Sequence, residues 1–105
     1  MRDVMALMES WYPAATAQSW DRVGLIVGDP DAPVRSLLLA LDPTAAIADQ
    51  AVAGPNGDGQ PYDMVITHHP LLLRGASFLP VTDPKGGVVT RLIRSGVSLF
   101  NAHTN

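Results

Sequence analysis

The segment Tyr62–Pro70, with the sequence YDMVITHHP, constrains the fold of this chain more than any other. It begins as an apolar run with β-branched residues, which is typical of a buried strand. It ends in two adjacent histidines and Pro70, which has no amide hydrogen and restricts the residue before it. The strand therefore ends at side chains that are able to bind metal ions or transfer protons.

The two imidazoles limit what kind of site can form there. Successive residues of a strand point to opposite faces, so His68 and His69 diverge unless His69 leaves the strand geometry. This geometry favours two neighbouring metal positions, or one histidine ligand beside a group hydrogen-bonded to it. It disfavours an arrangement in which both histidines bind the same ion. The structural alternative is a strand end with one surface histidine and one histidine that caps the loop.

The composition excludes several classes of protein. With 105 residues, 47% of them hydrophobic, the chain has room for one small domain with a packed core. The net charge is −3, and the lysines and arginines are scattered, unlike the basic surface of a nucleic-acid-binding protein. The absence of cysteine excludes disulfides and thiolate metal sites and leaves histidine and carboxylate as the strong metal ligands.

The hydrophobic segments do not indicate a membrane protein. The N-terminal residues lack the long apolar region of a signal peptide. The longest apolar run, Leu37–Leu41, is too short to cross a bilayer. We therefore expect a cytoplasmic protein with neither a membrane nor a nucleic-acid partner.

Apolar periodicity predicts one helix and four strands. Residues 2–11 form an amphipathic helix whose apolar stripe, Val4, Leu7, Met8 and Trp11, is expected in the core. Strands are expected at residues 23–28, 34–41, 62–67 and 97–101. The run 34–41 has no period of two, which is typical of a strand covered on both faces.

Capping residues predict two further helices between these strands. Thr44 is a good N-cap for a helix over residues 44–53, with Ile47 and Val52 facing inward. Asp83 and Pro84 open a helix over residues 84–95, which Gly96 ends. Its buried stripe is expected to consist of Val88, Val89, Leu92 and Ile93. Two consecutive strand–helix–strand units predict an α/β fold with a mainly parallel sheet flanked by helices.

Three consecutive strands end in polar side chains: Asp42, then His68 with His69, and finally His103. Because the carboxyl ends of parallel strands lie along one edge of the sheet, these groups are able to converge there. Asp42 could instead start a turn, and His103 could bond a loop carbonyl. Asp21 either belongs to the same site or caps the turn into its strand.

Other familiar motifs are absent. Gly86-Gly87 lacks the lysine and hydroxyl spacing of a phosphate-binding loop, and no serine sits in a nucleophile elbow. Trp11 and Trp20 are more typical of a core or an interface than of a substrate platform. The glycine- and proline-rich segment Gly54–Pro61 is the most plausible place for an insertion.

Four motifs follow one another along nearly the whole chain: WDRVGLIVG at residues 20–28, ALDPT at 40–44, DMVITHHPL at 63–71 and NAHTN at 101–105. Together they resemble the Nif-three-like dinuclear metal family, whose bacterial members carry the name type 2 GTP cyclohydrolase I. Because four motifs occur in order, the resemblance is specific, and it strengthens the interpretation of His68 and His69 as metal ligands.

The resemblance implies two divalent metal ions, zinc, iron or manganese, in a cleft between two related α/β halves. It assigns His68 and His69 as two of the ligands. The family's other ligands are an aspartate that would fall just beyond Asn105, and a histidine and a glutamate near the distant C-terminus. We therefore expect residues 1–105 to be an incomplete domain, the N-terminal part of a longer protein that forms homo-oligomers.

The remaining polar groups at the strand ends are expected to support this site. His103, Asp42 and Asp21 would lie close to the ligands, hydrogen-bonded to them or facing the substrate. No residue is singled out as a catalytic acid or base. With only two protein ligands, the 105-residue chain is expected to hold metal weakly and to be inactive.

The function that the resemblance implies is metal-assisted hydrolysis of a nucleotide or a phosphoester, with a small-molecule substrate. Nothing in these residues recognises a guanine or a triphosphate, so a phosphoesterase is a second enzymatic reading. The alternative from another class is a non-catalytic metal-binding protein with an interaction or regulatory role. We also expect exposed apolar surface, and with it self-association or marginal stability.

Overall fold

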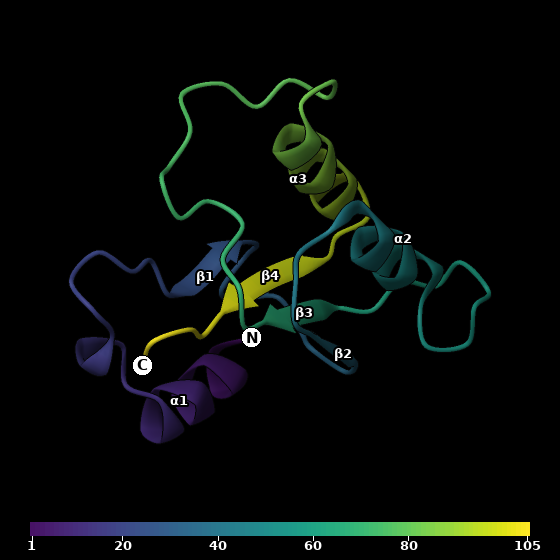
Figure 1. Ribbon diagram of the computed structural model, residues 1–105. Coiled ribbons are helices and arrows are strands. Elements are labelled where there is room, and N and C mark those ends of the chain that lie inside the picture. The colour runs from purple at the N-terminus through teal and green to yellow at the C-terminus, as the bar shows by residue number, and fades with distance from the viewer.

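The computed structural model describes residues 1–105 as a four-stranded sheet with helices on both of its faces (Figure 1). In chain order the elements are α1 (Arg2–Trp11), the 3-10 helix η1 (Ala14–Thr16), β1 (Gly24–Val27), β2 (Leu37–Ala40), α2 (Ala45–Ala53), β3 (Met64–Thr67), α3 (Pro84–Arg94) and β4 (Ser98–Asn101). All the predicted helices and strands are present, and their ends differ from the predicted ones by up to three residues.

The sheet has the strand order β1-β4-β3-β2 and is mainly parallel, as predicted. The β2–β3 and β3–β4 pairs are parallel and are connected through α2 and α3, whereas β1 runs antiparallel to β4. The strand predicted at residues 62–67 lies inside the sheet, between two neighbours. Its Met64 and Val65 are 0% and 2% exposed, which explains the apolar run that marks it in the sequence.

The predicted caps begin and end the two crossover helices. The Thr44 hydroxyl accepts a hydrogen bond from the Ile47 amide at 3.2 Å, and the Asp83 carboxylate accepts one from the Gly86 amide at 2.9 Å. Gly96 has a φ of +70°, the left-handed conformation that ends α3. The first turn of each helix therefore has a side-chain acceptor for a free amide, as the sequence predicts.

Two apolar clusters hold the layers together, one on each face of the sheet. Figure 1 shows α2 and α3 on one face and α1 on the other. The larger cluster joins α2 and α3 to the sheet and consists of Ala48, Ala51, Val65, Leu71, Val88, Val89, Leu92, Val97 and Leu99. The smaller one consists of Met1, Met64 and Phe100, against which α1 packs through Val4, Met5 and Met8.

The prediction that residues 34–41 form a strand covered on both faces is wrong. β2 is an edge strand that begins only at Leu37, and its Leu37 and Leu39 are 42% and 72% exposed. The face stays open because one helix is narrower than the four-stranded sheet: a helix about 10 Å across covers only about two strands spaced about 4.8 Å apart. α1 packs over Met64 and Phe100 of β3 and β4 and leaves the same face of β2 open.

Three helix predictions also need correction. In α1, Val4 and Met8 pack as expected, but Leu7 and Trp11 are 47% and 62% exposed, because the helix contacts the sheet over a narrow stripe. In α3, Ile93 is 61% exposed and does not belong to the buried stripe. In α2, Ala48 and Ala51 form the buried face with Ile47 beside them, and Val52 is outside both clusters.

None of these helices has the length and apolarity that crossing a bilayer requires.

Candidate metal site

The carboxyl ends of the parallel strands bring the predicted site residues together. His68 and His69 follow β3, Asp42 lies just after β2, and His103 follows β4. Asp21 precedes β1 and reaches the same place because β1 runs antiparallel to β4. All five side chains therefore meet at one edge of the sheet.

The backbone of the two adjacent histidines is held by hydrogen bonds on both sides. The His68 and His69 amides donate to the carbonyls of Ala40 and Leu41 at 3.3 and 2.8 Å. The His68 carbonyl accepts from the Asn101 side-chain amide, and the His69 carbonyl accepts from the Thr67 hydroxyl, both at 2.9 Å. All four backbone polar groups of the pair thus have partners, which fixes the backbone positions from which the two imidazole side chains extend.

The two imidazoles do not diverge. β3 ends at Thr67, so both histidines lie beyond the regular strand. Their ring centroids are 5.1 Å apart with the ring planes at 41°. His69 has therefore left the strand geometry, which was the condition under which the pair could share one site.

His103 completes a cluster of three imidazoles. Its ring centroid lies 5.0 Å from that of His68 and 5.8 Å from that of His69. One ligand nitrogen from each ring lies within 4.8 Å of the others. Two nitrogens bound to one zinc ion are at most about 4 Å apart, twice the Zn–N distance. Small ring rotations would bring the three nitrogens close enough together to bind one ion. At their present spacing they fit two neighbouring ions.

Two of the three histidines contact a carboxylate through Nδ1. His69 Nδ1 lies 2.5 Å from Asp42 Oδ1, and both side chains are about half exposed. His103 Nδ1 lies 3.3 Å from Asp21 Oδ2, whose side chain is fully buried. An ionised carboxylate only accepts hydrogen bonds, so the Nδ1 atom of each of these rings is the donor.

The carboxylate of Asp21 is held in its ionised form. Burial by itself would raise the pKa of Asp21. Hydrogen bonds from the hydroxyl and the amide of Thr104, and then from His103 and the Arg22 amide, outweigh burial and lower the pKa of Asp21 below its ordinary value. A negative charge therefore stays beside His103 at neutral pH.

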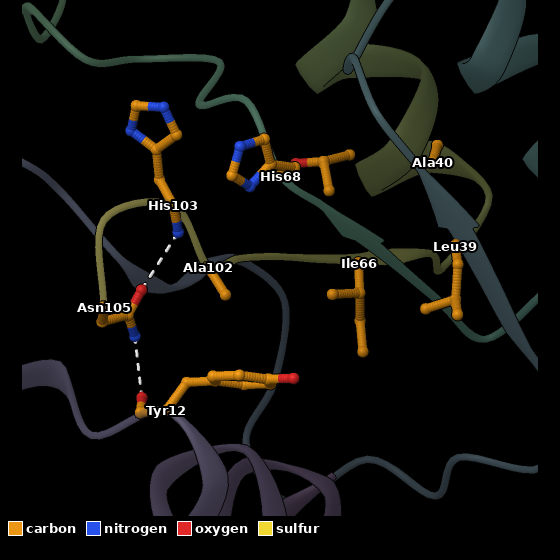
Figure 2. A pocket seen from close by; sticks show the side chains of 9 residues that line it. Tyr12, Leu39, Ala40, Ile66, His68, Ala102, His103 and Asn105 are labelled. Atoms are coloured by element: carbon orange, nitrogen blue, oxygen red, sulfur yellow. Dashed lines mark hydrogen bonds between the residues drawn. The ribbon is translucent and has the colours of Figure 1, made fainter.

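A cavity of about 390 Å³ opens next to the histidines (Figure 2). Its lining residues are Tyr12, Leu39, Ala40, Ile66, Thr67, His68, Ala102, His103 and Asn105. Figure 2 shows the Tyr12 ring lying across the space from Ile66, while the His68 and His103 rings stand at its other end. One end of the cavity is therefore apolar and the other carries imidazole nitrogens.

Three residues near the site were missed in the sequence. Thr67 and Asn101 pair in register at the ends of β3 and β4, and both are polar residues that end apolar runs, which is the signal that could have identified them. Tyr12 carries no such signal, because only tertiary packing brings it to the cavity. Trp20, interpreted as a core or interface residue, lies edge-on to His103 with the centroids 6.1 Å apart, whereas Trp11 does not line the cavity.

Comparisons with known proteins agree with these motifs. The whole chain, residues 1–105, matches the family described as Duf34/NIF3 (NGG1p interacting factor 3). The GTP cyclohydrolase 1 type 2 homolog of Mycobacterium tuberculosis is 46% identical over 105 residues, which are 100% of this chain and 26% of that protein. The homolog of Streptomyces coelicolor is 40% identical over 105 residues, or 35% of its length.

Solved structures agree with the fold as well. A Staphylococcus aureus protein superposes with a TM-score of 0.86 at 36% identity, over 98% of this chain and 31% of that one. A Bacillus cereus protein related to NIF3 superposes with a TM-score of 0.84 at 30% identity, over 97% of this chain and 26% of that one. In length, the chain spans only about a quarter of the Mycobacterium tuberculosis homolog. Motifs, fold and matches agree, and the chain belongs to the Duf34/NIF3 family.

Proposed function

We propose that residues 1–105 supply the histidine side of a metal-dependent hydrolase site that acts on a nucleotide or phosphoester substrate. The observation that carries the proposal is the cluster of His68, His69 and His103, whose ligand nitrogens lie within 4.8 Å of one another at the edge of the sheet. Neutral imidazole is a good ligand for zinc and iron. The names of the relatives, GTP cyclohydrolase 1 type 2 homolog, support a hydrolytic reaction on a nucleotide.

The chain's own residues have distinct parts in this proposal. His68 and His69 would bind the ion or ions, with His103 beside them as a third nitrogen donor. Asp21 and Asp42 hold two of these rings, and the cavity along Tyr12 and Ile66 would bind the apolar part of a substrate. A bound divalent ion would supply Lewis-acid activation of water and of the bond to be cut.

The rest of the site belongs to the proposal too. Dinuclear sites need several carboxylates or imidazoles, so a two-ion centre would draw further ligands from outside residues 1–105. The chain spans 26% of the Mycobacterium tuberculosis homolog, which leaves room for them in proteins of that length. Assembly into a homo-oligomer is part of the same proposal.

The second candidate function is a non-catalytic metal-binding protein with an interaction role. The observation that favours it is the exposure of the site, because His68 is exposed and the neighbouring Asp42–His69 pair is about half exposed. A metal held at an open site of this kind would be accessible to a partner protein. Turnover distinguishes the two functions, because only the hydrolase loses an activity when the metal is chelated.

The test compares bound metal and turnover in the full-length wild-type protein with those of its His68→Ala, His69→Ala and His103→Ala variants. Each change removes a nitrogen donor, so we expect each variant to retain a fraction of the wild-type zinc or iron, measured by elemental analysis after gel filtration. Asp49→Ala is the control, because Asp49 pairs with Arg91 on the surface away from the histidines.

Hydrolysis of bis-p-nitrophenyl phosphate and of GTP is measured on the same samples. Turnover that is lost on chelation and restored by added metal supports the hydrolase. Full metal content without turnover of either compound supports the non-catalytic function instead. If His68→Ala and His69→Ala both keep the full complement of metal, the histidines are structural and the proposal fails.

A further inference from the structure

Asp42 contacts His69 from the neighbouring strand. The ends of β2 and β3 lie side by side (Figure 1), and Asp42 follows Leu41, whose carbonyl accepts the His69 amide at 2.8 Å. One residue further, Asp42 Oδ1 lies 2.5 Å from His69 Nδ1. The side-chain contact therefore lies one residue beyond the last backbone hydrogen bond between the two chain segments that extend β2 and β3.

This pair differs from the other ion pairs on the surface. Arg2–Asp31 and Arg91–Asp49 join long, flexible arginines to aspartates, and all four side chains are more than half exposed. Exposed pairs of that kind contribute little to stability. In Asp42–His69 both side chains are short, and the His69 backbone is fixed through its amide and its carbonyl. The His69 ring is thus attached to a fixed backbone and is contacted by Asp42 at Nδ1.

The contact also determines which nitrogen of His69 is free. A metal binds neutral imidazole, in which one nitrogen carries the hydrogen and the other carries the lone pair. Because the Asp42 carboxylate accepts the hydrogen at Nδ1, the lone pair is at Nε2. His68 has no carboxylate partner, so nothing comparable selects its tautomer.

We infer that Asp42 is a positioning residue that holds His69 as the Nδ1–H tautomer and presents Nε2 to the metal ion. The inference rests on the proposed metal binding, but it concerns a residue outside the group of three nitrogen donors. It also explains why an aspartate stands two residues after the end of β2, since that position faces His69 just beyond β3.

The first test needs neither metal nor activity. Long-range ¹H–¹⁵N spectra of the imidazole rings are recorded on the metal-free protein at about pH 8, where an ordinary imidazole with a pKa near 6.5 is neutral. We expect the Nδ1–H tautomer for His69 in the wild type and a shift toward the Nε2–H tautomer in Asp42→Ala. Asp49→Ala, which removes another ion-paired aspartate, should leave the His69 signals unchanged.

The second test measures zinc affinity by competition with a chromophoric chelator. Loss of a carboxylate behind a metal-binding histidine typically weakens metal affinity by about 10–100-fold, and we expect that loss in Asp42→Ala. Asp42→Asn keeps an oxygen that is able to accept the Nδ1 hydrogen, so it should recover part of the affinity. Thermal unfolding and circular dichroism check that both variants fold as the wild type does.

The outcomes separate this inference from the proposed function. If His69→Ala loses zinc but Asp42→Ala binds it within about twofold of the wild type, the metal site stands and the positioning role is wrong. An unchanged His69 tautomer in Asp42→Ala overturns the inference as well. If His69→Ala itself keeps its zinc, His69 is not a ligand and the inference fails. If His68→Ala keeps its zinc as well, the proposed metal site fails too.

Discussion

At the scale of single residues, the site depends on buried polar groups that are almost fully paired. Asn101 is 1% exposed and donates both of its side-chain hydrogens, to the carbonyls of Thr67 and His68 at 3.2 and 2.9 Å. Its Oδ1 is buried without a partner. The orientation of this amide is nevertheless fixed, because turning it over would place Oδ1 against two carbonyl oxygens.

Asp21 makes stability depend on pH at this same scale. Its pKa is lowered in the folded protein, so the stability it contributes is present above the ordinary value of 3.8 and is lost as the pH falls through the lowered value. We expect Asp21→Asn to lower the free energy of unfolding by about 1–3 kcal/mol at neutral pH, because charged hydrogen bonds are lost.

Urea unfolding at a series of pH values checks this expectation. The difference between the wild type and Asp21→Asn should shrink as the pH falls below about 3.8. Asp58→Asn, a change in the exposed 54–61 segment, is the control and should show little difference at any pH. A difference for Asp21→Asn that does not vary with pH would contradict the account of its carboxylate.

At the scale of elements, the pairing of β1 with β4 depends on a glycine. Gly28 follows β1 with a φ of +129°, and a methyl group at its position would overlap the side chain of Ser98 at the start of β4. We expect Gly28→Ala to lower the free energy of unfolding by at least about 2 kcal/mol, from backbone strain and from the overlap together.

A second glycine separates the two contributions. Gly24, at the start of β1, has a similar positive φ, +116°, but a methyl group there would meet no atom within 4 Å. Gly24→Ala should therefore show strain alone and lose less stability than Gly28→Ala in the same urea titration. Equal losses in the two variants would mean that the contact with Ser98 does not limit how β1 packs.

At the scale of the whole molecule, the open face of β2 exposes apolar side chains to water. Leu37, Leu39 and Leu41 are 42%, 72% and 58% exposed, and β2 is an edge of the sheet. An exposed apolar edge strand favours association, and lysine on such a strand opposes it. We expect the 105-residue chain to self-associate at micromolar concentration and Leu39→Lys to reduce that association.

Sedimentation velocity over a range of concentrations measures this. Ile93→Lys is the matched control, because Ile93 is 61% exposed but lies on α3, away from β2. It should leave the association of the chain unchanged. A wild-type chain that stays monomeric throughout, with a high melting temperature, would show that the apolar face of β2 is tolerated in water.

Residue types and their spacing were enough to predict the helices and strands and that most strands of the sheet run parallel. Thr44, Asp83 and Gly96 act on the backbone within a few residues of themselves, so their effects follow from the local sequence. The assignment of His68 and His69 as metal ligands came from their place at a strand end and from the family motifs, and it stays a prediction.

Only the tertiary structure decided how the elements share the sheet and which side chains meet. That β2 is an edge and β1 is antiparallel depends on which strands pair, and pairing joins residues far apart in the sequence. The contacts of Asp42 with His69 and of Asp21 with His103 span 27 and 82 residues. Contacts of that range depend on which strands pair, and parallel strands joined through a helix are not paired by a local turn.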